Sequence, residues 1–193
     1  VDSMSTVREL MGDSPYSNIM PFWHTVTVKV FVDLGLKLFG DMNAAIALFH
    51  GVQILFMAVS FGYVIMTMYQ IGVPLWFLAA SYAVYAFQPY NIVYSVILWK
   101  DIPFAVAGLL FITALFRLLK GIGKRKFWNY TVFVFGALGF SLWRTNGWYA
   151  FLVTLLVLLI LMGKEQKKLL ILMMAVLILS WVLINPVLDV LDV

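Results

Sequence analysis

The chain has 193 residues, of which 64% are hydrophobic and only 11% are charged, and its formal net charge is +4. Its mean hydropathy of +0.99 lies far above the roughly half-apolar composition of soluble domains, so we expect a multi-pass membrane protein. Cysteine is absent, which excludes disulfide frameworks, thiolate zinc sites and cysteine nucleophiles. Two histidines, His24 and His50, are too few for a histidine-rich metal site.

The first residues are polar and show no signal-peptide pattern. Asp2 or Ser3 can cap a short helix that the sequence "GDSP" ends. Because the chain starts at Val1 without an initiator Met, we interpret it as a fragment of a longer protein.

Residues 21–40 predict a helix long enough to cross a bilayer, yet Lys29, Asp33 and Lys37 recur at every fourth position. Three charges near the centre of a spanning helix would cost about 2.5–3.5 kcal/mol each on insertion scales. An amphipathic helix lying in the membrane interface avoids most of this cost and lets the charges pair along one face. The alternative is a spanning helix whose charges face the interior of a bundle.

Later in the chain, long apolar runs indicate about six transmembrane helices, two of them short. We expect an all-α fold with an extracytoplasmic segment over 1–41 and a transmembrane domain over 42–193. The expected spans lie near residues 42–70, 73–98, 102–119, 127–143, 147–163 and 169–187.

Basic residues cluster in two of the connections between these runs. One group lies between the third and fourth runs and the other between the fifth and sixth; they are Arg117, Lys120, Lys124, Arg125 and Lys126, and Lys164, Lys167 and Lys168. The positive-inside rule places both connections in the cytoplasm. Residues 1–41, 99–101 and 144–147 and the C-terminal residues then lie on the outer face, which also receives eight of the nine acidic residues in the sequence.

Three polar clusters on the outer side are candidates for chemistry. The first contains Asp2 and the turn with Tyr16, Asn18, Trp23, His24 and Thr25; the second is Lys100-Asp101; the third carries Arg144 before an Asn-Gly turn. Structural roles are open for each. Asp101 suits a helix N-terminus, Arg144 can extend from the membrane boundary toward water, and the tryptophans suit an interfacial belt.

The order of several motifs adds a resemblance. The blocks "PFWHT", "LWKDIPF" and "RTNG" follow a short outer-face helix and an amphipathic helix. In this order the chain resembles the N-terminal half of GT-C fold membrane glycosyltransferases, a group that includes protein O-mannosyltransferases and lipid A aminoarabinose transferases. Uncharacterised bacterial polysaccharide-type members are the most similar, and the resemblance covers most of residues 1–150.

This resemblance implies a transferase that moves a sugar from a polyprenyl-phosphate-linked donor to an acceptor at the outer face. Asp2 matches the catalytic base and Asp101 a second outer-loop acidic residue, while Lys100 or Arg144 would contact the donor phosphate. His24, Trp23 and Asn18 are expected to position the donor or the acceptor.

The acceptor can be a glycan, a lipid or a protein, and we expect no nucleic-acid partner. Some relatives use a divalent cation, and because Asp2 has no adjacent carboxylate, metal use stays open. The resemblance implies a bacterial plasma membrane. Since the family's first transmembrane helix and C-terminal part have no counterpart here, we expect this polypeptide alone to be inactive.

A non-enzymatic multi-pass protein, such as a transporter or flippase of lipid-linked saccharides, is the main alternative. Transporters place ionisable residues near the middle of the bilayer and use broken helices in paired repeats. The runs from residue 42 onward hold no acidic residue at their centres, which favours the transferase. A purely structural membrane subunit is the third hypothesis.

Overall fold

A computed structural model describes residues 21–123, 126–144, 146–161 and 166–190. Over these residues the chain is all-helical and contains no β-strand, which confirms the predicted all-α class. The helices are α2 (Phe22–Phe39), α3 (Met42–Gln70), α4 (Leu75–Phe87), α5 (Pro89–Ser95), α6 (Asp101–Lys120), α7 (Lys126–Leu142), α8 (Gly147–Leu161) and α9 (Lys167–Val190).

Local sequence explains several helix boundaries. The Asp41 carboxylate accepts a hydrogen bond of 2.9 Å from the backbone N–H of Ala44 and so caps the start of α3. Two helices end at a glycine in the left-handed conformation. Gly40 follows α2 with φ of 68°, and Gly121 follows α6 with φ of 65°. Five of the six expected apolar runs therefore appear as single helices close to their predicted bounds.

Three helical segments in the described part of the chain are long and apolar enough to cross a membrane: Met42–Gln70, Asp101–Lys120 and Lys167–Ile184. Shorter apolar helices cover Leu75–Phe87 and Gly147–Leu161. The 17 residues of α7 correspond to about 25 Å of helix, somewhat less than the ~30 Å hydrocarbon core.

The run expected as one span over 73–98 is instead two helices. Gln88 adopts an extended conformation, with φ of −65° and ψ of 122°, and separates α4 from α5. Pro89 explains the break, because proline disfavours helical geometry in the preceding residue and cannot donate a backbone hydrogen bond. The 13 residues of α4 reach only about 20 Å, too short to cross the hydrocarbon core alone.

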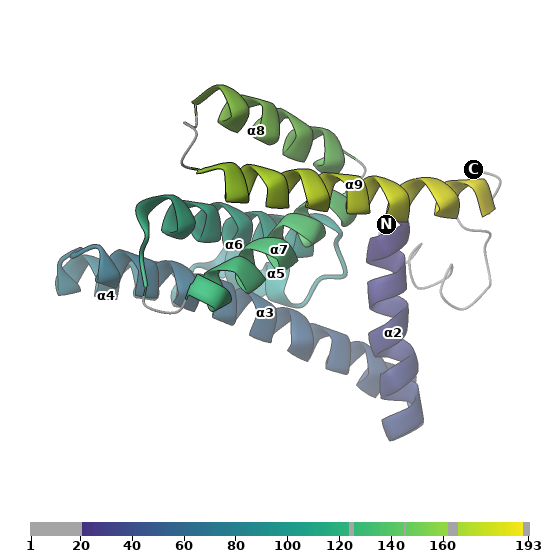
Figure 1. Cartoon of the computed structure of the whole chain (residues 1–193). Coiled ribbons are helices and arrows are strands. Elements are labelled where there is room, and N and C mark those ends of the chain that lie inside the picture. Colours follow the sequence, from purple (N-terminus) through teal and green to yellow (C-terminus); the bar gives the residue numbers. More distant parts are fainter. Residues whose placement is uncertain (1–20, 124–125, 145, 162–165, 191–193) are drawn as a thin grey trace.

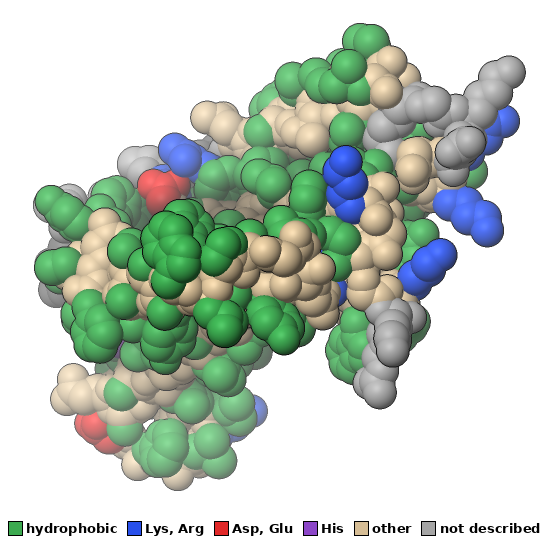
Figure 2. All heavy atoms as spheres, turned by 90° about the vertical axis from the view of Figure 1, so that its left-hand side faces the viewer, with side chains coloured by type: hydrophobic (Ala, Val, Ile, Leu, Met, Phe, Trp, Pro, Cys, Tyr) green, Lys and Arg blue, Asp and Glu red, His purple; other side chains and the backbone are tan. Residues whose placement is uncertain are grey.

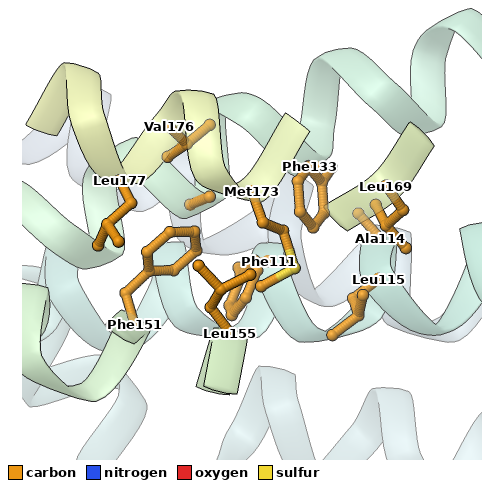
Figure 3. Close-up of a cluster of buried hydrophobic side chains, with 11 residues drawn as sticks. Phe111, Ala114, Leu115, Phe133, Phe151, Leu155, Leu169, Met173, Val176 and Leu177 are labelled. Atoms are coloured by element: carbon orange, nitrogen blue, oxygen red, sulfur yellow. The ribbon is translucent and has the colours of Figure 1, made fainter. Parts of the chain in front are cut away.

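Helices α6 to α9 surround the main apolar core (Figure 3). Aromatic rings from three helices meet there, since the Phe111 ring lies 5.4 Å from that of Phe133 and 5.3 Å from that of Phe151, measured between centroids. Helix α9 covers them with Leu169, Met173, Val176 and Leu177.

Small residues allow α6 and α7 to approach each other closely. A Cβ at Gly136 would lie 2.6 Å from the backbone nitrogen of Phe111, so the helix backbones touch at this point. One buried polar contact joins α7 to α9, because the hydroxyls of Ser141 and Ser180 lie 2.7 Å apart. Short helix separation and a hydrogen bond between small polar residues are both typical of helix packing in membranes.

Helix α2 crosses α3 and α9 steeply, whereas α3, α6, α8 and α9 run more nearly alongside one another (Figure 1). Its buried face consists of His24, Val28, Val32 and Gly35. A Cβ at Gly35 would lie 2.6 Å from the Cα of Ala45, so the two helices touch at their crossing. The predicted pairing along the charged face is confirmed: Lys29 Nζ lies 3.2 Å from Asp33 Oδ2.

The bundle has two chemically different ends. Helix α2 lies at the end where α3 and α6 begin, and its partners there include the C-terminal half of α9. The opposite end carries the C-terminus of α6 and the N-termini of α7 and α9, with their basic residues. Figure 2 shows hydrophobic side chains over much of one face, with most of its Lys and Arg side chains in the right-hand half of the view.

Candidate functional site

Asp101 is the first residue of α6, at the end of the bundle where α2 lies. A carboxylate in the first turn of a helix is stabilised by the positive end of the helix dipole. Asp101 therefore has the structural role of a negative charge at a helix N-terminus. This role does not explain why a basic side chain from the α7–α8 connection pairs with its carboxylate.

That partner is Arg144, which lies in the connection between α7 and α8. Its Nη1 atom lies 3.2 Å from Asp101 Oδ1, and the two side chains are 43% and 35% exposed. The guanidinium carbon also lies 5.5 Å from the centre of the Phe104 ring, one turn into α6. A guanidinium that is shared between a carboxylate and an aromatic ring, and is still partly exposed, retains N–H groups that can donate to a phosphate.

The backbone after Arg144 turns tightly into α8. The N–H of Gly147 donates to the carbonyl oxygen of Arg144 at 2.9 Å. A Cβ at Gly147 would collide with the carbonyl oxygen of Phe140, so only glycine fits at this position without a shift. The predicted Asn-Gly turn thus fixes where the Arg144 side chain begins.

His24 and Lys100 bring a second pair of predicted residues to this end. His24 is 1% exposed, and neither of its ring nitrogens has a hydrogen-bond partner among the described residues. Burial, and to a lesser extent the positive charge of Lys100, lower the pKa of His24 to about 4. His24 is therefore neutral at pH 7, and Lys100 lies close enough to act on it electrostatically.

Two tryptophans attach α2 to the rest of this end. The indole N–H of Trp23 donates to the carbonyl oxygen of Leu183 in α9 at 3.1 Å. The indole N–H of Trp143, which directly precedes Arg144, donates to the Thr27 hydroxyl at 3.2 Å. These contacts tie α2 to α9 and to the residue before Arg144, so Trp23 has a structural role in the arrangement.

An apolar groove leads to Asp101. One cavity of about 550 Å³ is lined by Asp101, Trp99 and Tyr94 at its polar end and by α3 and α6 along its length. A second, of about 280 Å³, shares four lining residues with it, namely Met57, Phe61, Tyr85 and Asn91. The two cavities are neighbours, both lined mostly by apolar and aromatic side chains of α3, α4, α5 and α6, and we refer to them together as the groove.

Gln53 fixes the backbone that enters this site. Its amide Nε2 lies within hydrogen-bond distance of three carbonyl oxygens, those of Tyr94, Ser95 and Ile97, at 2.9 to 3.1 Å. Because Gln53 is 5% exposed, these bonds are shielded from water. Gln53 therefore positions the segment that leads to Trp99, Lys100 and Asp101.

Of the seven residues predicted for the site, the structure pairs Asp101 with Arg144, places Lys100 where its charge acts on His24, and bonds Trp23 to α9. The other two, Asp2 and Asn18, lie outside the described residues. Within the described part of the chain no three His, Asp or Glu side chains group to hold a metal ion. Sequence reasoning missed Phe104, the positioning role of Gln53 and the groove, since each depends on contacts between helices.

No protein-family model matches this chain, and neither a curated protein nor a solved structure shows significant similarity to it. The functional interpretation accordingly rests on the residues themselves and on the geometry of the site.

Proposed function

We propose that the chain is part of a GT-C-type glycosyltransferase of the bacterial plasma membrane, which transfers a sugar from a polyprenyl-phosphate-linked donor to a glycan, lipid or protein acceptor on the outer face. The observation that carries the proposal is Asp101, which lines the aromatic-lined groove and also pairs with Arg144. An apolar groove suits a polyprenyl chain, and a partly exposed guanidinium paired with a residue of its lining suits the phosphate.

The proposed membrane arrangement follows from the two ends of the bundle. Six spans would cross the bilayer, with the interrupted α4–α5 segment counted as one, and α2 would lie in the outer interface. The steep crossing of α2 over α3 and the solvent-exposed Lys29–Asp33 pair support this placement (Figure 1). Arg117, Lys120, Lys126, Lys167 and Lys168 would then be cytoplasmic.

The chemistry is an inverting displacement at the anomeric carbon of the donor sugar. The acceptor oxygen forms a bond to this carbon while the bond from the carbon to the phosphate oxygen breaks. A carboxylate takes the proton of the acceptor hydroxyl, and the departing phosphate keeps the bonding electrons. Arg144 and Lys100 would stabilise the developing negative charge.

In this scheme the family resemblance assigns the base to Asp2. Asp101 holds Arg144 in place beside the groove, which would pre-organise the guanidinium before the donor binds. Neutral His24 and the helix α2 that carries it would limit access of water to the phosphate end of the groove.

The groove gives the proposal a direct test. Ala105 lines the groove and is exposed, so Ala105→Trp should fill it and raise the KM for a long-chain polyprenyl-phosphate donor by about tenfold or more. The matched control is Ala79→Trp, an exposed position on α4 that does not line the groove. Assays use the full-length protein in proteoliposomes, with folding checked by thermal unfolding in detergent.

The transporter alternative predicts a different result in the same vesicles. A flippase would move a fluorescent lipid-linked saccharide between leaflets without releasing its sugar. Sugar release by the wild-type protein, reduced by Ala105→Trp and unchanged in Ala79→Trp, supports the transferase. Movement of the lipid without sugar release would overturn it.

A further inference from the structure

A separate cavity with polar lining residues lies at the opposite, basic end of the bundle. It has a volume of about 820 Å³, far above the roughly 30 Å³ that a water molecule occupies in the liquid, and it opens between the ends of α3 and α6 and the start of α7. Its lining includes Arg117, Lys120, Gln70 and Asn129. Nothing in the proposed transferase chemistry uses this cavity.

Arg117 is the central feature of this cavity. Its side chain is 3% exposed although it lines the opening. Nε donates to Asn129 Oδ1 and Nη1 donates to Thr67 Oγ1, both at 2.9 Å. The guanidinium carbon lies 4.9 Å from the centre of the Tyr63 ring.

These neighbours orient the guanidinium but do not neutralise it. Asn129 and Thr67 are uncharged and accept from two of the five N–H groups that a guanidinium carries. The described acidic side chains, Asp33, Asp41 and Asp101, belong to α2 or to the starts of α3 and α6, at the other end of the bundle. Asp101 and Arg117 are separated by 16 residues of α6, or about 24 Å along the helix.

Asn129, which accepts a hydrogen bond from Arg117, is itself held in place by two further hydrogen bonds. Asn129 Nδ2 donates to the carbonyl oxygen of Ile122 at 2.7 Å, and its Oδ1 also accepts from the Tyr63 hydroxyl at 3.0 Å. The amide orientation of Asn129 is thus fixed by both of its ends. A pre-oriented guanidinium loses little conformational entropy when an anion binds.

The loop after α6 lies directly against the guanidinium. Gly121 and Gly123 both have positive φ, at 65° and 92°. A Cβ at Gly123 would lie 2.8 Å from Arg117 Nη2, so the absence of a side chain leaves room beside this nitrogen. Lys120 adds a second positive charge to the lining.

We propose that this cavity is a binding site for a phosphate-bearing anion, held by Arg117 through the N–H groups for which no described residue is an acceptor and by Lys120 as a second cation. Phosphate matches the planar fork of arginine, and a buried guanidinium without a described counter-ion favours an anionic ligand. The ligand is either the headgroup phosphate of an anionic lipid in the adjacent leaflet or a soluble phosphate. This site is independent of the proposed transferase activity.

The test is thermal unfolding of the full chain in phosphatidylcholine vesicles, titrated with inorganic phosphate against sodium chloride at equal ionic strength. A parallel series replaces part of the phosphatidylcholine with phosphatidylglycerol. We expect a saturable rise of the unfolding midpoint of about 2–4 °C in at least one series. A response to inorganic phosphate identifies a soluble ligand, and a response only to phosphatidylglycerol identifies a lipid headgroup.

Variants separate the site from general positive charge. Lys120→Gln should weaken the apparent affinity at least threefold, and Arg117→Lys, which keeps the charge but loses the fork, about tenfold. Lys126→Gln is the matched control, because this exposed lysine lies at the same end without lining the cavity. No stabilisation of the wild type in either series, or an equal loss in Lys120→Gln and Lys126→Gln, would overturn the proposal.

Discussion

Arg144 lies in the connection between α7 and α8 and Asp101 begins α6, and their Nη1 and Oδ1 atoms lie 3.2 Å apart. This pair joins the start of α6 to the turn between α7 and α8, and its Asp101 also lines an apolar groove. The Arg144 and Asp101 side chains are 43% and 35% exposed. Solvent therefore screens their attraction, and the pair contributes little to stability. Its placement therefore points to a role in binding a ligand.

Replacing one member of this pair should affect activity far more than folding. We expect Arg144→Gln to change the free energy of unfolding by no more than about 1 kcal/mol and to reduce donor turnover by about 100-fold, as for loss of a group that stabilises transition-state charge. Lys29→Gln breaks an ion pair of similar exposure on α2 and should leave turnover unchanged. Equal turnover in both variants would contradict the assignment of Arg144.

The crossing of α2 over α3 predicts opposite effects for two glycine substitutions. Gly35→Ala should destabilise the protein by about 1–3 kcal/mol, because the added Cβ would lie 2.6 Å from the Cα of Ala45. Gly51→Ala should be neutral or stabilise by up to about 1 kcal/mol, since no atom lies within 4 Å of its added Cβ. Chemical denaturation in detergent measures both, and destabilisation by Gly51→Ala alone would show that the crossing is placed wrongly.

His24 predicts a loss of stability in mild acid. Its pKa is lowered to about 4 in the folded protein from about 6.5 when unfolded, so the unfolded state binds more protons between these values. The stabilisation is complete above pH 6.5 and is lost as the pH falls toward 4, which amounts to about 2 kcal/mol at pH 5.

The measurement is the unfolding midpoint at pH 7.5 and pH 5. His24→Phe keeps a flat ring without a titrating group and should remove most of the difference in unfolding midpoint between the two pH values. His50→Phe should retain most of that difference. A difference that persists unchanged in His24→Phe would show that other groups cause it.

Gln53 predicts a positioning effect on the loop before α6. Gln53→Leu removes an amide that donates its two N–H groups among three partly buried carbonyl oxygens and should cost about 1–3 kcal/mol of stability. It should also lower turnover, because the segment that carries Lys100 and Asp101 loses its support. Asn43→Leu, an exposed position on the same helix that lines none of the cavities, is the control and should change neither quantity.

Apolar runs predicted most of the helices correctly because long hydrophobic segments act locally, and the structure adds the Asp41 cap and the glycine stops at their ends. The sequence prediction joined the apolar residues on both sides of Gln88 and Pro89 into one run and so lacked the break, although Pro89 was a usable local signal. The helix–helix contacts of Gln53 and Phe104 could not be predicted, since a periodic pattern gives a helix's faces but not its neighbours.

The same distinction applies to the candidate sites. The sequence grouped Lys100, Asp101 and Arg144 by membrane side, and the structure places Asp101 and Arg144 in contact. From the sequence, Arg117 is interpreted only as part of a basic connection between helices. Its burial cannot be predicted, because it depends on Thr67 and Asn129 from other helices. Asp2, which the family resemblance makes the base, lies outside the described residues, so its role stays a prediction.

The most direct measurement of the central claim is sugar release from a polyprenyl-phosphate-linked donor by the full-length protein in proteoliposomes. Wild type, Asp2→Asn, Asp101→Asn and the surface control Asp33→Asn would be compared after each is shown to fold and bind donor. The transferase proposal predicts turnover by wild type and Asp33→Asn, with a loss of orders of magnitude in Asp2→Asn and a smaller but clear loss in Asp101→Asn. No donor consumption by wild type across a panel of sugars, or full activity in both Asp2→Asn and Asp101→Asn, would contradict it.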